Sequence, residues 1–292
     1  MAVDTVLEMN LKPQDIDNLA AELREYHAIY SPLFHRREQR EKAEQYIGGL
    51  LLDIPDKAIE PMVLARQGVD QSAVRTMQLF ISRGAWEDDL ILKQHWREVN
   101  KDLGEESGVF TLDGSDFPKQ GNESVGVKRQ YCGELGKVAN CQAGVFLGYA
   151  SSKGYTLLER RLYLPEEWVE DEAYAEKRQK CGVPKEIVFE TKPMLGWEMI
   201  EAVHEEKVLR GHWLACDEAF GRDTHFLDQV AEKGLWYYAE VPHDIRVWLE
   251  RPATAIPEWS GRGREPTRER VVEGEPSPQS IAEIAQTLAE HR

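Results

Sequence analysis

VFTLD (residues 109–113) and WLACD (residues 213–217) are two short apolar runs that each end at an aspartate. Apolar runs of this length, bounded by polar residues, are typical of buried β-strands. An aspartate that closes such a strand is held on rigid backbone at the edge of the sheet, with access to solvent. The pattern therefore predicts two strands whose carboxyl ends present Asp113 and Asp217.

The chemistry of these two side chains depends on whether the strands are neighbours. Two adjacent carboxylates repel each other unless a cation bridges them, and Mg²⁺ favours oxygen ligands of this kind. A pair of such ions can activate a water or a 3′ hydroxyl and stabilise the leaving oxygen of a phosphodiester. We therefore predict that Asp113 and Asp217 lie near enough to share one ion. The alternative is a structural role, since aspartate also favours turns.

The surrounding sequence predicts a mixed α/β fold. Apolar runs at 142–150 and 155–164 predict a hairpin that turns at 151–154, and the polar, glycine-punctuated stretch 114–140 is expected to be a loop. A short extended piece is expected at 187–189, helices from Pro193 to about residue 209 and over 224–233, and another strand over 235–241. The coarse order β-β-β-α-β-α-β describes a mixed sheet with helices on its faces.

The two ends of the chain differ from this middle region. Apolar residues at helical spacing predict a helical bundle before residue 108, with helices at 36–52, 71–83 and 86–103. A DNA-binding role for this bundle stays open, although no helix-turn-helix pattern stands out. Residues 251–278, rich in Pro, Gly and charge, predict a loop, and helical spacing resumes at 279–292. The expected domains are 1–107, 108–250 and 251–292.

Composition limits the class of protein. No apolar run approaches the ~20 residues that span a bilayer, and the first residues lack the basic segment of a signal peptide. The four cysteines lack zinc-site spacing, and the glycines match no nucleotide-binding loop. We expect a cytoplasmic protein without a membrane partner.

The net charge of −16 argues against nucleic-acid binding, which usually needs a basic face. A chain this acidic must gather its Lys and Arg locally or use metal ions to meet phosphates. One stretch after Asp113 is locally basic, and its side chains are candidates for phosphate contacts or, alternatively, for a solvated hairpin face. These candidates are Lys119, Lys128, Arg129 and Lys137.

Two longer blocks carry a resemblance to a known family. LDGSDFPKQGNESVGVKRQYCGELGKVANCQAGVFLGYAS (residues 112–151) and LACDEAFGRDTHFLDQVAEKGLWYYAEVPHDIRVW (residues 214–248) resemble the two aspartate blocks of bacterial insertion-sequence transposases of the DDE superfamily. The resemblance implies a ribonuclease-H-like fold, with Asp113 and Asp217 as the first two catalytic aspartates. It also implies Mg²⁺ or Mn²⁺ as cofactor, DNA partners (terminal repeats and target), a homodimer during synapsis, and nucleoid association.

The sequence departs from the family pattern after Asp217. The family completes its site with a downstream glutamate in a Trp/Tyr-x-x-Glu-x-x-Phe-like pattern, which is absent here, and Glu283 and Glu290 lack the surrounding aromatic residues. Residues 251–292 instead resemble the start of the segment that the family inserts before that glutamate. The sequence therefore predicts a truncated site with little strand-transfer activity.

Three functions remain open at this point. The chain could be a transposase whose active form includes a further C-terminal part. It could be a catalytically inactive, transposase-derived regulator that binds DNA or a full-length partner. It could also be an acidic interaction protein that has kept the fold and lost contact with DNA.

Overall fold

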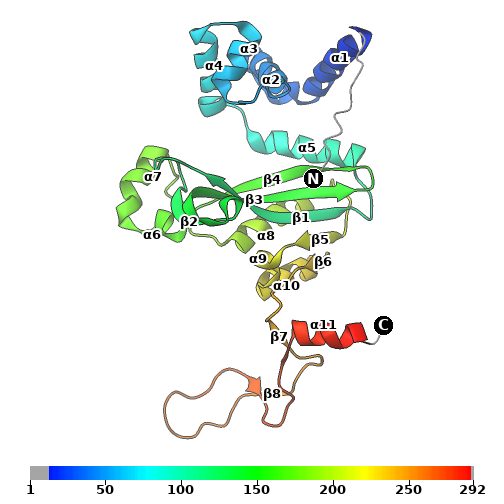
Figure 1. Ribbon diagram of the computed structural model, residues 1–292, viewed down its shortest axis with the longest axis vertical. Helices are drawn as coiled ribbons and strands as arrows, with labels where there is room; N and C mark the ends of the chain where they lie inside the picture. Colours follow the sequence, from blue (N-terminus) through cyan, green and yellow to red (C-terminus); the bar gives the residue numbers. More distant parts are fainter. Residues whose placement is uncertain (1–12, 291–292) are drawn as a thin grey trace. The chain divides into compact units, whose positions relative to one another are not determined.

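The computed structural model describes residues 13–290, which form two compact units, the first ending at Glu98 and the second beginning at Val99 (Figure 1). Residues 1–12, on which the argument against a signal peptide rests, and residues 291–292 lie outside the described part. Within residues 13–290, no helix combines the length and the apolar character needed to cross a bilayer.

The first unit is helical, as the sequence predicts. Asp70 caps one of its helices, because its Oδ1 accepts hydrogen bonds from the N–H groups of Ser72 (2.9 Å) and Ala73 (3.0 Å). The short helix at 59–67 was not predicted from the sequence, since its few residues show little periodicity. The helices are α1 (Pro13–Tyr30), α2 (Arg37–Leu50), α3 (Ile59–Gln67), α4 (Gln71–Arg83) and α5 (Asp88–Asp102), of which α5 continues into the second unit.

A cluster of apolar side chains holds this unit together. Phe34 and Phe80 lie with their ring centroids 6.0 Å apart, and the indole N–H of Trp86 donates to the Phe80 carbonyl (2.9 Å). Around them the buried members of the cluster are Ala43, Val63, Ala73 and Met77. The apolar stripes of the sequence therefore serve bundle packing.

The second unit is built on a mixed β-sheet. Its strands lie in the order β2-β3-β1-β5-β6, and β4 pairs with the same edge of β3 as β2 does, farther along the strand. β1 is antiparallel to β3 and parallel to β5, which is parallel to β6. The strands are β1 (Val109–Pro118), β2 (Lys128–Cys132), β3 (Lys137–Ser151), β4 (Gly154–Tyr163), β5 (Trp213–Cys216) and β6 (Trp236–Ala239). The mixed α/β class predicted from the sequence is confirmed.

Three local predictions are wrong. β1 does not close at Asp113 but continues to Pro118, because residues of β3 pair with it along its whole length. The stretch 114–140 is not all loop, because Lys128–Cys132 pairs with Lys137–Cys141 as β2. No strand forms at 187–189. In the first two cases a distant partner strand outweighs the local glycine and polar content.

Helices cover one face of the sheet. The apolar side of α8 (Lys192–Glu205) packs on it through Leu195, Met199 and Val203, which are buried. Gly196 brings α8 close, since a Cβ placed there would lie 2.6 Å from Cδ2 of Leu112. Leu112 therefore faces α8, and because side chains alternate along a strand, Asp113 points to the other face. The remaining helices of this region are α6 (Glu166–Glu170), α7 (Ala175–Cys181), α9 (Glu218–Gly221) and α10 (Thr224–Glu232).

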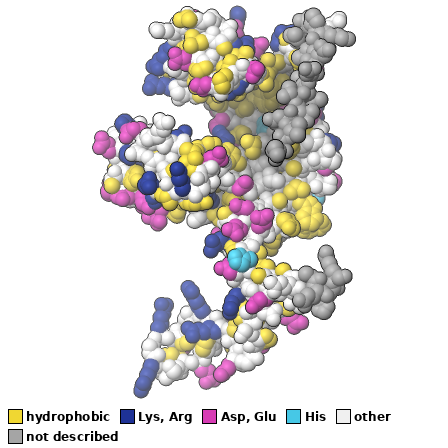
Figure 2. All heavy atoms as spheres, in the orientation of Figure 1, with side chains coloured by type: hydrophobic (Ala, Val, Ile, Leu, Met, Phe, Trp, Pro, Cys, Tyr) yellow, Lys and Arg dark blue, Asp and Glu magenta, His cyan; other side chains and the backbone are white. Residues whose placement is uncertain are grey.

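The last part of the chain is mostly loop, as predicted, and two short ladders tie it together. β7 (Arg246–Val247) pairs with β10 (Gln279–Ser280), and β8 (Thr254–Ala255) pairs with β9 (Arg270–Val271). The expected terminal helix is α11 (Ile281–Glu290). Arg262, Arg264 and Arg268 are exposed in this loop, and Figure 2 shows basic side chains gathered on the segment around β8.

We predict that Gly221→Ala destabilises the second unit by about 1–3 kcal/mol, the usual cost of overpacking. A Cβ at this position would overlap the carbonyl oxygen of Glu240, where α9 meets the end of β6. Urea unfolding followed by circular dichroism measures the change. Gly121→Ala is the control, because its Cβ would meet no atom within 4 Å. Equal stability of the two variants would show that this contact is not tight.

Candidate active site

Asp113 and Asp217 occupy equivalent positions on adjacent parallel strands. The register of β1 and β5 ends with Leu112 opposite Cys216; Asp113 is the next residue of β1, and Asp217 directly follows the end of β5. Neighbouring strands lie about 4.8 Å apart, so the register brings the two residues side by side. The sheet thus unites two acidic residues that are remote in sequence.

Local hydrogen bonds orient both carboxylates. Oδ1 of Asp113 accepts from the N–H of Gly114 (2.7 Å), and the side chain is exposed. Asp217 leaves β5 in an extended conformation and caps α9, since its Oδ1 accepts from the N–H of Ala219 (3.0 Å). Its carbonyl oxygen accepts from Gly221 (2.8 Å), which fixes the turn away from the sheet.

The edge of β1 is open beside this pair. From Asp113 to Pro118, β1 pairs with β3 on one side, and no described strand pairs with its other side. A hollow of about 490 Å³ lies on the Asp113 face of the sheet. Phe117 and Phe146 form part of its wall, with ring centroids 6.0 Å apart. An extended ligand therefore has access to Asp113 both along the edge and from this face.

The donor set fits a divalent cation in part. Two carboxylates supply the oxygen ligands that Mg²⁺ and Mn²⁺ accept, and Mg²⁺ usually keeps several waters. Within residues 13–290, no group of three His, Cys, Asp or Glu side chains is placed to hold a metal ion. Asp116 does not join the pair, because it alternates to the α8 face and its Oδ2 accepts from the N–H of Gly133 (2.7 Å). The two aspartates alone would therefore supply only part of a ligand set for such an ion.

Comparison with known proteins agrees with this geometry. A family model described as DDE superfamily endonuclease matches residues 30–292. The chain belongs to this family. No individual curated protein matches the sequence. The parallel strands β1, β5 and β6, joined to an antiparallel hairpin and covered by helices, agree with the ribonuclease-H-like fold of DDE endonucleases.

The four basic candidates of this DDE endonuclease lie in different environments. Lys128 is half-buried and forms an ion pair with Glu167, so its charge is already compensated. Lys119, Arg129 and Lys137 are exposed. Arg129 pairs with Asn140 of β3, which alternates onto the same face as Phe146, the partner of Asp113. Arg129 therefore shares the Asp113 face of the sheet.

A second acidic pair lies at the start of α8 and was not predicted, since its members carry no recognisable motif. Burial raises the pKa of Glu190 to about 7, and the hydrogen bond and negative charge of Glu198 add to the increase, while Arg161 opposes it. At neutral pH this pair therefore binds a proton part of the time. It holds less negative charge than two ordinary carboxylates would.

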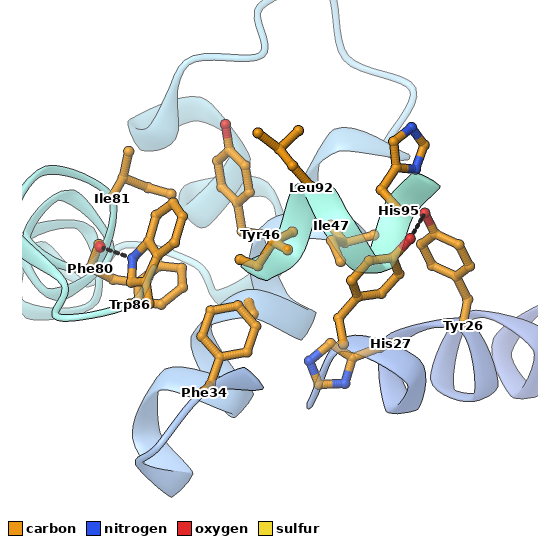
Figure 3. Close-up of a pocket in the computed structure, with 13 residues that line it drawn as sticks. Tyr26, His27, Phe34, Tyr46, Ile47, Phe80, Ile81, Trp86, Leu92 and His95 are labelled. Atoms are coloured by element: carbon orange, nitrogen blue, oxygen red, sulfur yellow. Dashed lines mark hydrogen bonds between the residues drawn. The ribbon is translucent and has the colours of Figure 1, made fainter. Parts of the chain in front are cut away.

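A large apolar cavity occupies the helical unit, lined by residues of α1, α2, α4 and α5 (Figure 3). Its volume is about 420 Å³, and its wall includes the hydrogen-bonded hydroxyls of Tyr26 and Tyr30 (3.3 Å). His27 is buried there, and its Nε2 has no hydrogen-bond partner. The lining contains no carboxylate, so this cavity offers no ligand set for phosphodiester chemistry.

We predict that Glu198→Gln weakens the pH dependence of stability. A carboxyl whose pKa is raised on folding contributes stability that is present below pH 4.5 and lost as the pH rises through about 7. Removing the Glu198 charge lowers the pKa of Glu190, so the free energy of unfolding falls less across this window. Urea unfolding at its two ends measures the difference. Glu186→Gln, an exposed change nearby, keeps the wild-type dependence. An unchanged slope in Glu198→Gln would contradict the coupling.

Proposed function

We propose that this DDE endonuclease cleaves and joins DNA as an insertion-sequence transposase, with Asp113 and Asp217 holding Mg²⁺ or Mn²⁺. The observation that supports the proposal is the β1–β5 register, in which Asp113 and Asp217 directly follow the last paired residues, Leu112 and Cys216, beside an open strand edge. Its substrates would be terminal-repeat and target DNA, and two copies of the chain would act together at synapsis.

The residues of the chain have distinct parts in this proposal. When bound, the divalent metal supplies an activated water or 3′ hydroxyl and stabilises the leaving oxygen of the phosphodiester. Asp113 and Asp217 would hold it with the carboxylate oxygens that their local hydrogen bonds leave available. The free edge of β1 gives the DNA strand room to lie against both carboxylates. Arg129, on the same face as Asp113, is placed to contact a phosphate farther along the strand.

A third acidic ligand is needed for full strand-transfer chemistry, because positioning depends on a complete ligand shell. Residues 13–290 place no such residue beside the pair. We therefore propose that the chain, with only these two ligands, cleaves DNA poorly. Efficient Mg²⁺-dependent cleavage of terminal-repeat DNA by the purified chain would contradict this.

A second candidate function follows from the same observation together with the net charge of −16. A chain with an incomplete ligand set could act as a catalytically inactive regulator that binds DNA or a full-length transposase. Metal binding without turnover, combined with inhibition of an active transposase, would favour this role.

We predict that Mn²⁺ stabilises the wild-type chain and that Asp113→Asn and Asp217→Asn each remove this effect. A ligand that binds only the folded state, at ~100 times its Kd, adds about 2.7 kcal/mol to stability. Thermal unfolding with and without Mn²⁺ measures it. Asp116→Asn is the matched control, since this carboxylate bonds to Gly133 on the other face and should leave the Mn²⁺ response intact. Wild-type stabilisation in Asp113→Asn would rule out the proposed site.

We predict that Arg129→Gln weakens binding of duplex DNA more than Lys128→Gln does. Each phosphate contact adds about 0.9 to the slope of log Kobs against log salt concentration, so losing the Arg129 contact should lower that slope by a similar amount. Lys128 is paired with Glu167 and should change the slope little. Fluorescence anisotropy at several salt concentrations tests this, and equal slopes for both variants would refute the assignment.

A further inference from the structure

Lys192 is a basic side chain that approaches β1 next to the aspartate pair. It is the first residue of α8, whose N-terminus is capped by the Thr191 hydroxyl, which accepts from the N–H of Met194 (3.4 Å). Its Nζ lies 3.5 Å from the position that a Cβ on Gly114 would take. Gly114 directly follows Asp113, so the ammonium group rests against the strand at the level of the candidate site.

Two features hold the ammonium group at this position. The missing side chain at Gly114 leaves room for it, since a larger residue would project from β1 toward α8. On the other side, Nζ lies 5.7 Å from the ring centroid of Tyr163 in β4, a distance typical of a cation–π contact. Lys192 is half-buried in this arrangement, and its position is therefore defined by packing.

Its positive charge is not compensated by a carboxylate. Lys128, Lys180 and Lys233 each form an ion pair, with Glu167, Glu123 and Glu201. Among residues 13–290, no carboxylate forms an ion pair with Lys192. Glu190, two residues earlier, hydrogen-bonds with Glu198 and interacts with Arg161 instead. A half-buried ammonium group that contacts a ring but pairs with no carboxylate of residues 13–290 is suited to an anion that arrives from solution.

The geometry of the sheet brings this charge and the carboxylates to one place. Asp113 points to the face away from α8, whereas Lys192 approaches Gly114 from the α8 face. Beyond Leu112 no strand within residues 13–290 pairs with this edge of β1, so a chain lying along that edge can be reached from both faces. A DNA strand placed there would meet the aspartate pair on one side and the ammonium group on the other.

We propose that Lys192 is a positioning residue that binds a phosphate of the DNA strand laid along the free edge of β1. The assignment rests on the proposed DNA endonuclease function. Lysine binds phosphate as a compact point charge with several donors, which suits a contact that must adjust as the strand seats. This contact would also offset the repulsion between the DNA phosphates and the carboxylates where the DNA backbone comes nearest to them.

The test compares Lys192→Gln, Lys192→Arg and Lys177→Gln. Lys177→Gln is the matched control, because Nζ of Lys177 lies 5.4 Å from the Tyr174 ring centroid in a similar contact on α7. The probe is a short duplex with a free 3′ end, bound in Mn²⁺ and followed by anisotropy over a salt series. Lys192→Gln should weaken binding about tenfold and lower the salt slope by about 0.9, while the other two variants stay near wild type.

The outcomes separate this assignment from the proposed function. Asp113→Asn should abolish the part of DNA binding that depends on Mn²⁺. If it does, and Lys192→Gln still binds like wild type, the lysine assignment fails and the proposed function stands. Weaker DNA binding by Lys192→Arg with a wild-type salt slope would mean that packing on Tyr163, and not the charge, supports binding. This result would also overturn the assignment. Mn²⁺-dependent binding that survives Asp113→Asn would overturn the proposed function and this inference with it.

Discussion

The unequal pairing of β1 on its two edges is the constraint on which the site depends. β3 pairs with all ten residues of β1, whereas β5 pairs with four and then turns away. Asp113 lies at the step between the paired and the open edge. The turn at Asp217 is fixed by its cap on α9 and by Gly221, which packs against the Glu240 carbonyl oxygen. The same turn therefore places the second carboxylate and frees the edge beside the first.

Only part of this arrangement could be predicted from the sequence. The apolar runs before Asp113 and Asp217 show where both strands lie, because strand length and burial are local signals. The full extent of β1 and the existence of β2 depend on β3, a partner that local composition does not reveal. Asp113 still directly follows the last residue of β1 that pairs with β5, although β1 continues, because β5 is short. The approach of Lys192 to Gly114 depends on α8 packing and has no signal in the sequence.

Ion pairing also depends on the fold, and it distinguishes basic side chains that look alike in the sequence. Sequence alone groups Lys128 with Arg129, yet the two alternate to opposite faces of β2 and only Lys128 meets a carboxylate, Glu167, far along the chain. The charge of a lysine in such an ion pair is already neutralised, so this lysine contributes less to phosphate binding. In a chain of net charge −16, the proposed recognition of DNA would therefore depend on the cations that form no ion pair among residues 13–290, and on metal held by acidic residues.

The proposed site at an open strand edge would also make the affinities for metal and for DNA depend on each other. Two carboxylates leave most of the coordination shell of a divalent ion to water, and phosphate oxygens can replace those waters. In the proposed complex the ion would bind more tightly when DNA is present, and by thermodynamic linkage DNA would bind more tightly, by the same factor, when the ion is present. The open edge of β1 would thus couple the two ligands, because both need the space that β5 leaves free.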